Sequence, residues 1–174
     1  MKKVLLFCTC VLMSVNLMAQ SGHRGIDVDV DFGYNFNTKS SDFNFLSATA
    51  TFGKRFSRNL YAGVGAGAYL EDDVFKPKSS PGCSVPIFAD IRGYWPVDNT
   101  NMCPFLGIRA GYAINANGGS DSVILQITPG VQIPLSSTID LKIAAGYEHW
   151  ISTQQGVDDS GVLVIRVGIG LHKK

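Results

Sequence analysis

The chain alternates strictly between apolar and acidic residues over Ile26-Asp27-Val28-Asp29-Val30-Asp31-Phe32. Successive side chains of a β-strand point to opposite sides, so a period of two predicts a strand with two chemically different faces. One face of this strand would be apolar, and the other would carry three carboxylates.

The same alternation recurs seven more times along the chain. We expect strands over residues 24–36, 43–56, 60–70, 85–95, 104–113, 122–133, 139–150 and 161–171. One face of each strand carries no charge, although charged residues make up 17% of the sequence. No segment shows the spacing of an amphipathic helix. The pattern therefore predicts an all-β fold, an eight-stranded antiparallel up-and-down transmembrane β-barrel.

The N-terminal residues have the features of a secretory signal. Lys2 and Lys3 precede an apolar stretch that begins at Val4, and Leu17-Met18-Ala19 offers a cleavage site. The apolar stretch is too short to cross a membrane as a helix. We expect residues 1–19 to be removed, which leaves residues 20–174 as one outer-membrane β-barrel domain.

The charge balance gives no reason to expect a nucleic-acid partner. Cleavage would remove two of the 15 basic residues and none of the 14 acidic residues, for a mature net charge of −1. A nucleic-acid-binding domain usually carries a marked excess of basic residues.

Two cysteines remain after cleavage, and a pair in an exported protein usually forms a disulfide. Cys83 precedes the strand at 85–95 and Cys103 follows it. A strand of about ten residues rises roughly 33 Å, whereas a disulfide needs Cα atoms within about 7 Å. We therefore predict two free thiols.

The connections between the strands alternate in character. Those after the second, fourth and sixth strands are short, whereas the others are longer or more polar. The longer set comprises residues 37–42, 71–84, 114–121 and 151–160. Short periplasmic turns and longer outer loops are typical of an outer-membrane barrel. We expect the protein in the outer membrane with these four loops outside the cell.

The second face of the strands distinguishes a membrane barrel from a soluble lipocalin-like barrel, whose apolar face would point inward around a ligand. This face carries many glycines and eleven charged residues. The charged residues are Asp27, Asp29, Asp31, Arg55, Asp90, Arg92, Arg109, Asp140, Lys142, Glu148 and Arg166. A narrow eight-stranded interior needs small residues beside long ones, and six acids with five bases can pair when buried. We therefore predict a charged network in a filled lumen.

The chain resembles the small OmpA/OmpX-type outer-membrane β-barrel proteins, particularly the barrel-only members common in Bacteroidetes. The resemblance rests on the signal ending Met18-Ala19-Gln20, the glycine-alternating stretch at 61–67 and the closing stretch at 164–171. It implies a non-enzymatic role in envelope integrity or cell-surface interaction. The family usually ends in an aromatic residue, whereas Leu171 takes that place here.

One short segment has catalytic potential. His149 and Ser152, followed by Asp158 and Asp159, could supply a base and a nucleophile. The segment faintly resembles the outer-membrane lipid A deacylases, which have a His-x-Ser pair. His149 and Ser152 are three residues apart, so a regular strand points them to opposite faces. We expect no enzyme activity and keep a deacylase-like hydrolase as an alternative.

No cofactor or metal is expected. The aspartates at 27–31 do not form an EF-hand, because Phe32 and Thr38 occupy the positions of the required Gly and Glu. The expected partners are outer-membrane lipid, lipopolysaccharide and an unknown extracellular molecule, bound by a monomer. Pro129 inside a predicted strand suggests a bulge or an unpaired carbonyl.

Overall fold

The computed structural model describes residues 25–38, 44–71, 82–97, 101–117, 120–154 and 159–173. The predicted export signal at 1–19 lies outside these residues, as does part of each predicted outer loop. Within the described residues, no helix is both long enough and apolar enough to cross a membrane.

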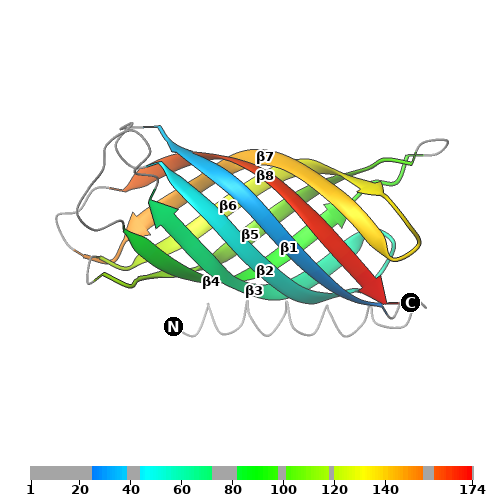
Figure 1. Ribbon diagram of the computed structural model, residues 1–174, viewed down its shortest axis with the longest axis horizontal. Helices are drawn as coiled ribbons and strands as arrows, with labels where there is room; N and C mark the ends of the chain where they lie inside the picture. Colours follow the sequence, from blue (N-terminus) through cyan, green and yellow to red (C-terminus); the bar gives the residue numbers. More distant parts are fainter. Residues whose placement is uncertain are drawn as a thin grey trace, which may run out of the picture.

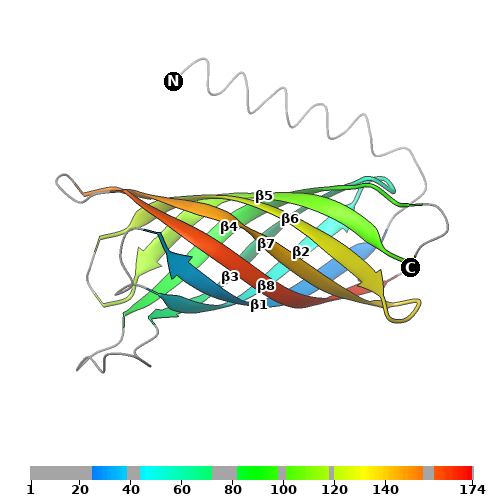
Figure 2. The same ribbon diagram turned by 90° about the horizontal axis from the view of Figure 1, so that it is seen from above.

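Eight antiparallel strands form a closed barrel, in which each strand pairs with its sequence neighbours and β1 pairs with β8 (Figures 1 and 2). The strands are β1 (Ile26–Asn37), β2 (Phe45–Arg55), β3 (Leu60–Glu71), β4 (Cys83–Tyr94), β5 (Cys103–Asn115), β6 (Ser122–Pro134), β7 (Ile139–Ser152) and β8 (Ser160–Lys173). The predicted strand number and up-and-down order are confirmed, and each strand boundary lies within two residues of the prediction.

The two ends of the barrel differ. One end, which we call the turn end, holds the connections after β2, β4 and β6 together with the C-terminus (right in Figure 1). The other end, the loop end, holds the connections after β1, β3, β5 and β7. Inward-pointing residues can therefore be placed along the barrel axis by their position in each strand.

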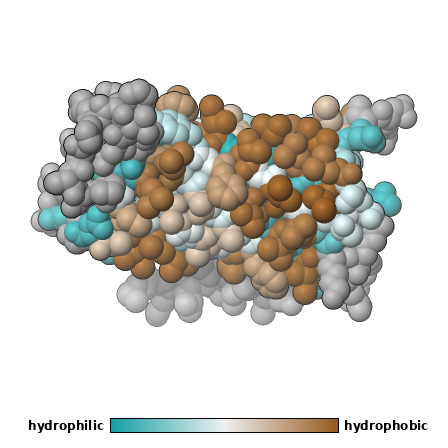
Figure 3. Space-filling view, viewed as in Figure 1, coloured by the Kyte–Doolittle hydropathy of each residue, from teal (hydrophilic) through white to brown (hydrophobic). Residues whose placement is uncertain are grey.

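The alternation of the sequence becomes an alternation of inside and outside. Large apolar side chains point outward from every strand and are exposed, as with Ile108 at 50% and Ile165 at 51%. Brown, apolar residues spread along the barrel wall in Figure 3, with teal, hydrophilic atoms concentrated toward its ends. The inward positions hold buried polar and charged residues such as Asp29 and Asp90. The predicted direction of both faces is confirmed.

Pro129 does not create a bulge. The recorded pairing of β6 with β7 passes from Ile127↔Tyr147 to Gly130↔Ala144, which is the same register on both sides of the proline. On its other side, Pro129 lies opposite Leu106 in an unbroken ladder. Of the two predicted alternatives, the bulge is absent, because the two neighbouring strands hold β6 in register. The ladder to β7 instead has a local gap at residues 128 and 129.

The two cysteines are free, as predicted. Cys83 begins β4 at the loop end, and Cys103 begins β5 at the turn end. The length of the barrel separates the two thiols.

Glycine at position 65 makes room for an inward-pointing aromatic ring. A Cβ built on Gly65 would lie 2.5 and 2.6 Å from ring carbons of Phe88 and 2.7 Å from the Ala50 carbonyl oxygen. Gly107 offers a matched inward position, because a Cβ there would meet nothing closer than 3.4 Å.

We predict that Gly65→Ala lowers the free energy of unfolding by about 1–3 kcal/mol, since overpacking forces neighbouring groups to move. Gly107→Ala should be neutral or stabilising by up to about 1 kcal/mol, because alanine restricts the unfolded chain. Urea unfolding of both variants in detergent micelles would measure this difference. Equal effects of the two substitutions would contradict the packing described here.

Candidate functional site

The eleven charged residues predicted for the lumen all lie on inward positions, and the structure joins them through three groups of contacts. The central cluster comprises Asp29, Asp31, Asp90, Arg92, Arg109 and Lys142. The turn-end cluster comprises Asp27, Arg55, Gln132, Asp140 and His172. The loop-end cluster comprises Tyr69, Gln126, Glu148, Trp150 and Arg166.

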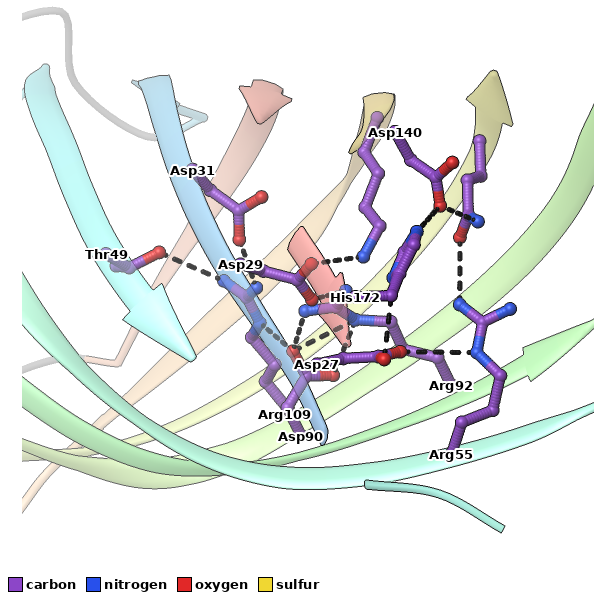
Figure 4. Close-up of polar contacts among 12 residues, drawn as sticks. Asp27, Asp29, Asp31, Thr49, Arg55, Asp90, Arg92, Arg109, Asp140 and His172 are labelled. Carbon is purple, nitrogen blue, oxygen red and sulfur yellow. Dashed lines mark hydrogen bonds and ion pairs between the residues drawn. The ribbon is translucent and has the colours of Figure 1, made fainter. Parts of the chain in front are cut away.

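The central cluster pairs three carboxylates with three cations across the barrel (Figure 4). Arg92 Nη1 donates to Asp29 Oδ2 at 2.5 Å, and Arg92 Nη2 donates to Asp90 Oδ2 at 2.5 Å. Arg109 spans Asp90 Oδ2 at 2.9 Å and Asp31 Oδ2 at 2.6 Å. Lys142 Nζ donates to the second oxygen of Asp29. Four strands, β1, β4, β5 and β7, are joined in this way.

Aromatic rings fill the space beside the guanidinium groups. Arg92 lies over the ring of Tyr61 with 4.9 Å to its centroid, and Arg109 lies over Phe88 at 4.7 Å. A cavity of about 20 Å³ among the central charges has room for about one water molecule. Charged and aromatic side chains thus surround this small cavity.

The turn-end cluster holds an imidazole between two carboxylates. His172 Nε2 contacts Asp140 Oδ2, and His172 Nδ1 lies 3.4 Å from Asp27 Oδ1. Arg55 Nε donates to Asp27 Oδ2 at 3.3 Å. Gln132 accepts a hydrogen bond from Arg55 at 3.3 Å and donates to Asp140. These contacts join β1, β2, β6, β7 and β8 near the C-terminus.

His172 lies one residue beyond Leu171, the last outward apolar residue of β8. The Asp140 and Asp27 carboxylates on either side of the imidazole raise the pKa of His172 to about 9. The imidazole is therefore a cation at neutral pH and adds a positive charge between two acids.

The loop-end cluster is centred on Glu148, whose side chain is fully buried. Its carboxylate accepts hydrogen bonds from Trp150 Nε1 at 2.6 Å, Gln126 Nε2 at 2.8 Å and Tyr69 Oη at 3.3 Å. Arg166 Nη2 lies 3.6 Å away. Trp150 points into the barrel mouth, because Glu148 and Trp150 share the inward side of β7.

The structure does not bring His149 and Ser152 together. His149 stacks on the exposed Tyr147 ring and lies 3.9 Å from Asp159 Oδ2. Ser152 lines the inner mouth, and its hydroxyl contacts the backbone of Gln154. A base must lie within hydrogen-bond reach of its nucleophile. The regular alternation of β7 places these two side chains on opposite faces.

Sequence reasoning missed several members of these clusters. His172 lies just beyond the predicted last strand at 161–171, and Gln132 and Gln126 carry no charge that would mark them. All three continue the inward alternation of their strands, as Arg166, Gly168, Gly170 and His172 do along β8. Counting every second residue of each strand, whether charged or not, identifies Gln126 and Gln132. Continuing the same count past residue 171 identifies His172.

No family model and no curated protein matches this chain. Solved structures match its fold. Neisserial surface protein A gives a TM-score of 0.64 at 20% identity, covering 86% of this chain and 97% of that chain. The N-terminal β-barrel domain of Pseudomonas aeruginosa OprF gives a TM-score of 0.57 at 11% identity, covering 88% of this chain and 100% of that chain.

The outer membrane enzyme PagL also matches, with a TM-score of 0.55 at 11% identity, covering 82% of this chain and 98% of that chain. At these identities the likeness shows the fold alone. The chain thus shares the closed eight-stranded barrel of small outer-membrane proteins, a fold that carries more than one function.

Asp90 tests the central cluster, because it accepts hydrogen bonds from both Arg92 and Arg109. Asp90→Asn keeps the shape but leaves three cations with two carboxylates. We predict a loss of about 3–5 kcal/mol in unfolding free energy, the usual effect of breaking a buried ion pair. Asp159→Asn, at an exposed ion pair, should cost less than about 1 kcal/mol. Urea unfolding in micelles compares them, and equal losses would contradict the buried pairing.

His172 predicts a pH dependence of stability. Because its pKa is higher in the folded state, its stabilisation is complete below about pH 6.5, the unfolded value, and is lost as pH rises through about 9. Wild type should exceed His172→Gln by on the order of 3 kcal/mol at pH 6, since one pKa unit corresponds to about 1.4 kcal/mol. The difference should vanish near pH 10. His149→Gln serves as the control, and a pH-independent difference at His172 would refute the prediction.

Proposed function

We propose that this chain is a non-enzymatic outer-membrane barrel with a plugged, charged lumen, which serves envelope integrity or cell-surface interaction through its loop end. The observation that carries the proposal is the combination of an exposed apolar wall with a buried ionic interior. A water-soluble protein rarely exposes so large a continuous apolar surface. In the hydrocarbon region of a membrane, exposed apolar side chains avoid the free-energy cost of contact with water. Closure of the barrel also leaves no unpaired strand edge there.

The wall would meet outer-membrane lipid and lipopolysaccharide. Aromatic residues lie near both ends of the apolar wall, among them Phe32 and Tyr112 toward the loop end and Phe52 and Trp95 toward the turn end. Rings at these levels suit the two membrane interfaces. The protein would act as a monomer, with an extracellular partner at the loop end.

The plugged lumen is part of the same proposal. Cross-barrel ion pairs, aromatic rings over the guanidinium groups and a central cavity of about 20 Å³ support it. Eight-stranded barrels are just wide enough for their side chains to fill the interior. The lumen charges would then have a structural role and would not line a path for ions.

The membrane placement predicts a position-dependent cost for charge on the wall. Ile108, at the middle of β5, is 50% exposed. Ile108→Arg should cost about 2–4 kcal/mol in lipid bilayers, as arginine does near the bilayer midplane. Leu135→Arg, in the exposed β6–β7 turn, should change stability by less than about 1 kcal/mol.

Unfolding of the two variants in lipid vesicles measures these costs. Recovery of folded wild-type protein from a periplasmic extract without detergent, with Ile108→Arg as stable as wild type, would reject the membrane barrel. That outcome would instead favour the soluble lipocalin-like alternative.

The plugged lumen predicts that the purified protein gives no conductance steps in a planar lipid bilayer, because no water-filled path crosses the central cluster. A sixteen-stranded porin in the same bilayer verifies the sensitivity of the recording. Steady steps that grow with salt concentration would show an open pore and refute the plug.

A further inference from the structure

A pocket of about 360 Å³ opens above the loop-end cluster. Its lining includes residues from every strand of the barrel or from the ends beside them, so closure of the sheet itself builds it. Binding sites for small molecules usually enclose about 300–1,000 Å³. The pocket therefore has the size of a site for a small ligand, and every residue used below belongs to the described part of the chain.

Aromatic rings form the floor of this pocket. Phe45, Tyr69 and Trp150 lie 5.2–5.6 Å apart between ring centroids. Val162 packs in the same cluster. Trp150 Nε1 and Tyr69 Oη both donate to Glu148. Their polar atoms are thus engaged within the barrel, and these two bonds fix rings that present apolar surface to the pocket.

Hydroxyl and amide groups form the wall. They belong to Asn37, Ser84, Asn115, Ser120, Ser122, Ser152 and Ser160. A serine hydroxyl can donate one hydrogen bond and accept two. Within the described residues, the hydroxyls of Ser84, Ser122 and Ser160 have no hydrogen-bond partner, which leaves them available to a ligand.

Among the described residues that line the pocket, Glu71 is the one charged side chain. Its Oε2 accepts a hydrogen bond from the Gly82 backbone N–H at 3.2 Å, which holds the carboxylate at the edge of the pocket. A ligand carboxylate or sulfate would meet like charge there, whereas a neutral group or an amine would not.

A pure hydrocarbon ligand would bury the serine hydroxyls without hydrogen-bond partners, which costs free energy. A ligand without an apolar face would leave the aromatic floor unused. A pyranose ring satisfies both surfaces, because its polarised C–H groups can lie on the negative face of an aromatic ring while its hydroxyls bond to the serines.

We propose that the mouth pocket binds a sugar ring, neutral or carrying an amine, stacked on Trp150 and hydrogen-bonded to Ser122 and Ser160. The proposal rests on the pocket alone and does not require the membrane placement. It adds a small-molecule site to a barrel whose proposed role needs none.

Tryptophan fluorescence gives a direct test, because the chain has two tryptophans and Trp95 lies at the opposite end of the barrel. A Trp95→Phe protein in detergent micelles reports from Trp150 alone. Titration with N-acetylglucosamine and with glucosamine should give a saturable change in emission. Glucuronate should bind at least about tenfold more weakly, and Glu71→Gln should reduce that discrimination.

The serine contacts have a matched control. Ser122→Ala/Ser160→Ala in the same background should weaken N-acetylglucosamine binding about tenfold, as expected for two lost hydrogen bonds. Ser137→Ala, at the exposed β6–β7 turn, should leave it unchanged. A thermal unfolding scan verifies that each variant is folded.

Three results would overturn the proposal: no saturable change with either amino sugar, equal binding by the double-serine variant, or tighter binding of glucuronate. Tighter binding of hexanol, used as an alkyl probe, would also overturn it and would identify a hydrocarbon site. None of these outcomes bears on the unfolding experiments in lipid vesicles or on the conductance recordings, so failure of the sugar site and failure of the proposed function are distinguishable.

Discussion

Charges enclosed in a narrow closed barrel must neutralise one another, because little water can reach them. Asp29 illustrates the constraint: one of its oxygens binds Arg92 from β4 and the other binds Lys142 from β7, while its own strand is β1. Strands that share no backbone hydrogen bond are thereby held at fixed separation. Backbone hydrogen bonds close the sheet around the barrel, and the ion pairs connect non-neighbouring strands across the lumen.

The same constraint explains the small residues of the inner face. A guanidinium that must cross the lumen needs its aliphatic stem to pass beside neighbouring residues, and aromatic rings occupy what space remains. Gly65 lies under the Phe88 ring, which in turn lies under Arg109. Gly65, Phe88 and Arg109 thus form one stack. The Phe88 ring fits because residue 65 has no side chain, and the Arg109 guanidinium packs over that ring. Substituting any one alters the space for the others.

The alternation of the sequence predicted the strands, the direction of both faces and the free thiols, since each depends on a period of two or on strand length alone. It could not predict which acid meets which base. That depends on the stagger between strands, which places Asp31 of β1 beside Arg109 of β5. His172 was missed for another reason, because β8 continues two residues past its predicted end at residue 171. Pro129 leaves a gap in the ladder to β7 and no bulge, because the two neighbouring strands keep β6 in register.

The two mouths of the barrel are chemically unlike, and the sequence pattern alone did not show this. At the turn end, His172 and Arg55 pair with Asp27 and Asp140, so charged contacts continue to the last inward residues. At the loop end, the ion-paired cluster stops at Glu148, and aromatic rings beneath a wall of hydroxyls take its place, with Glu71 at the pocket edge. The ion pairs at the turn end hold neighbouring strands together, and their charged groups are already bonded to one another. Hydroxyl groups above an apolar floor can exchange water for a ligand at little cost, and for this reason the proposed sugar site is placed at the loop end.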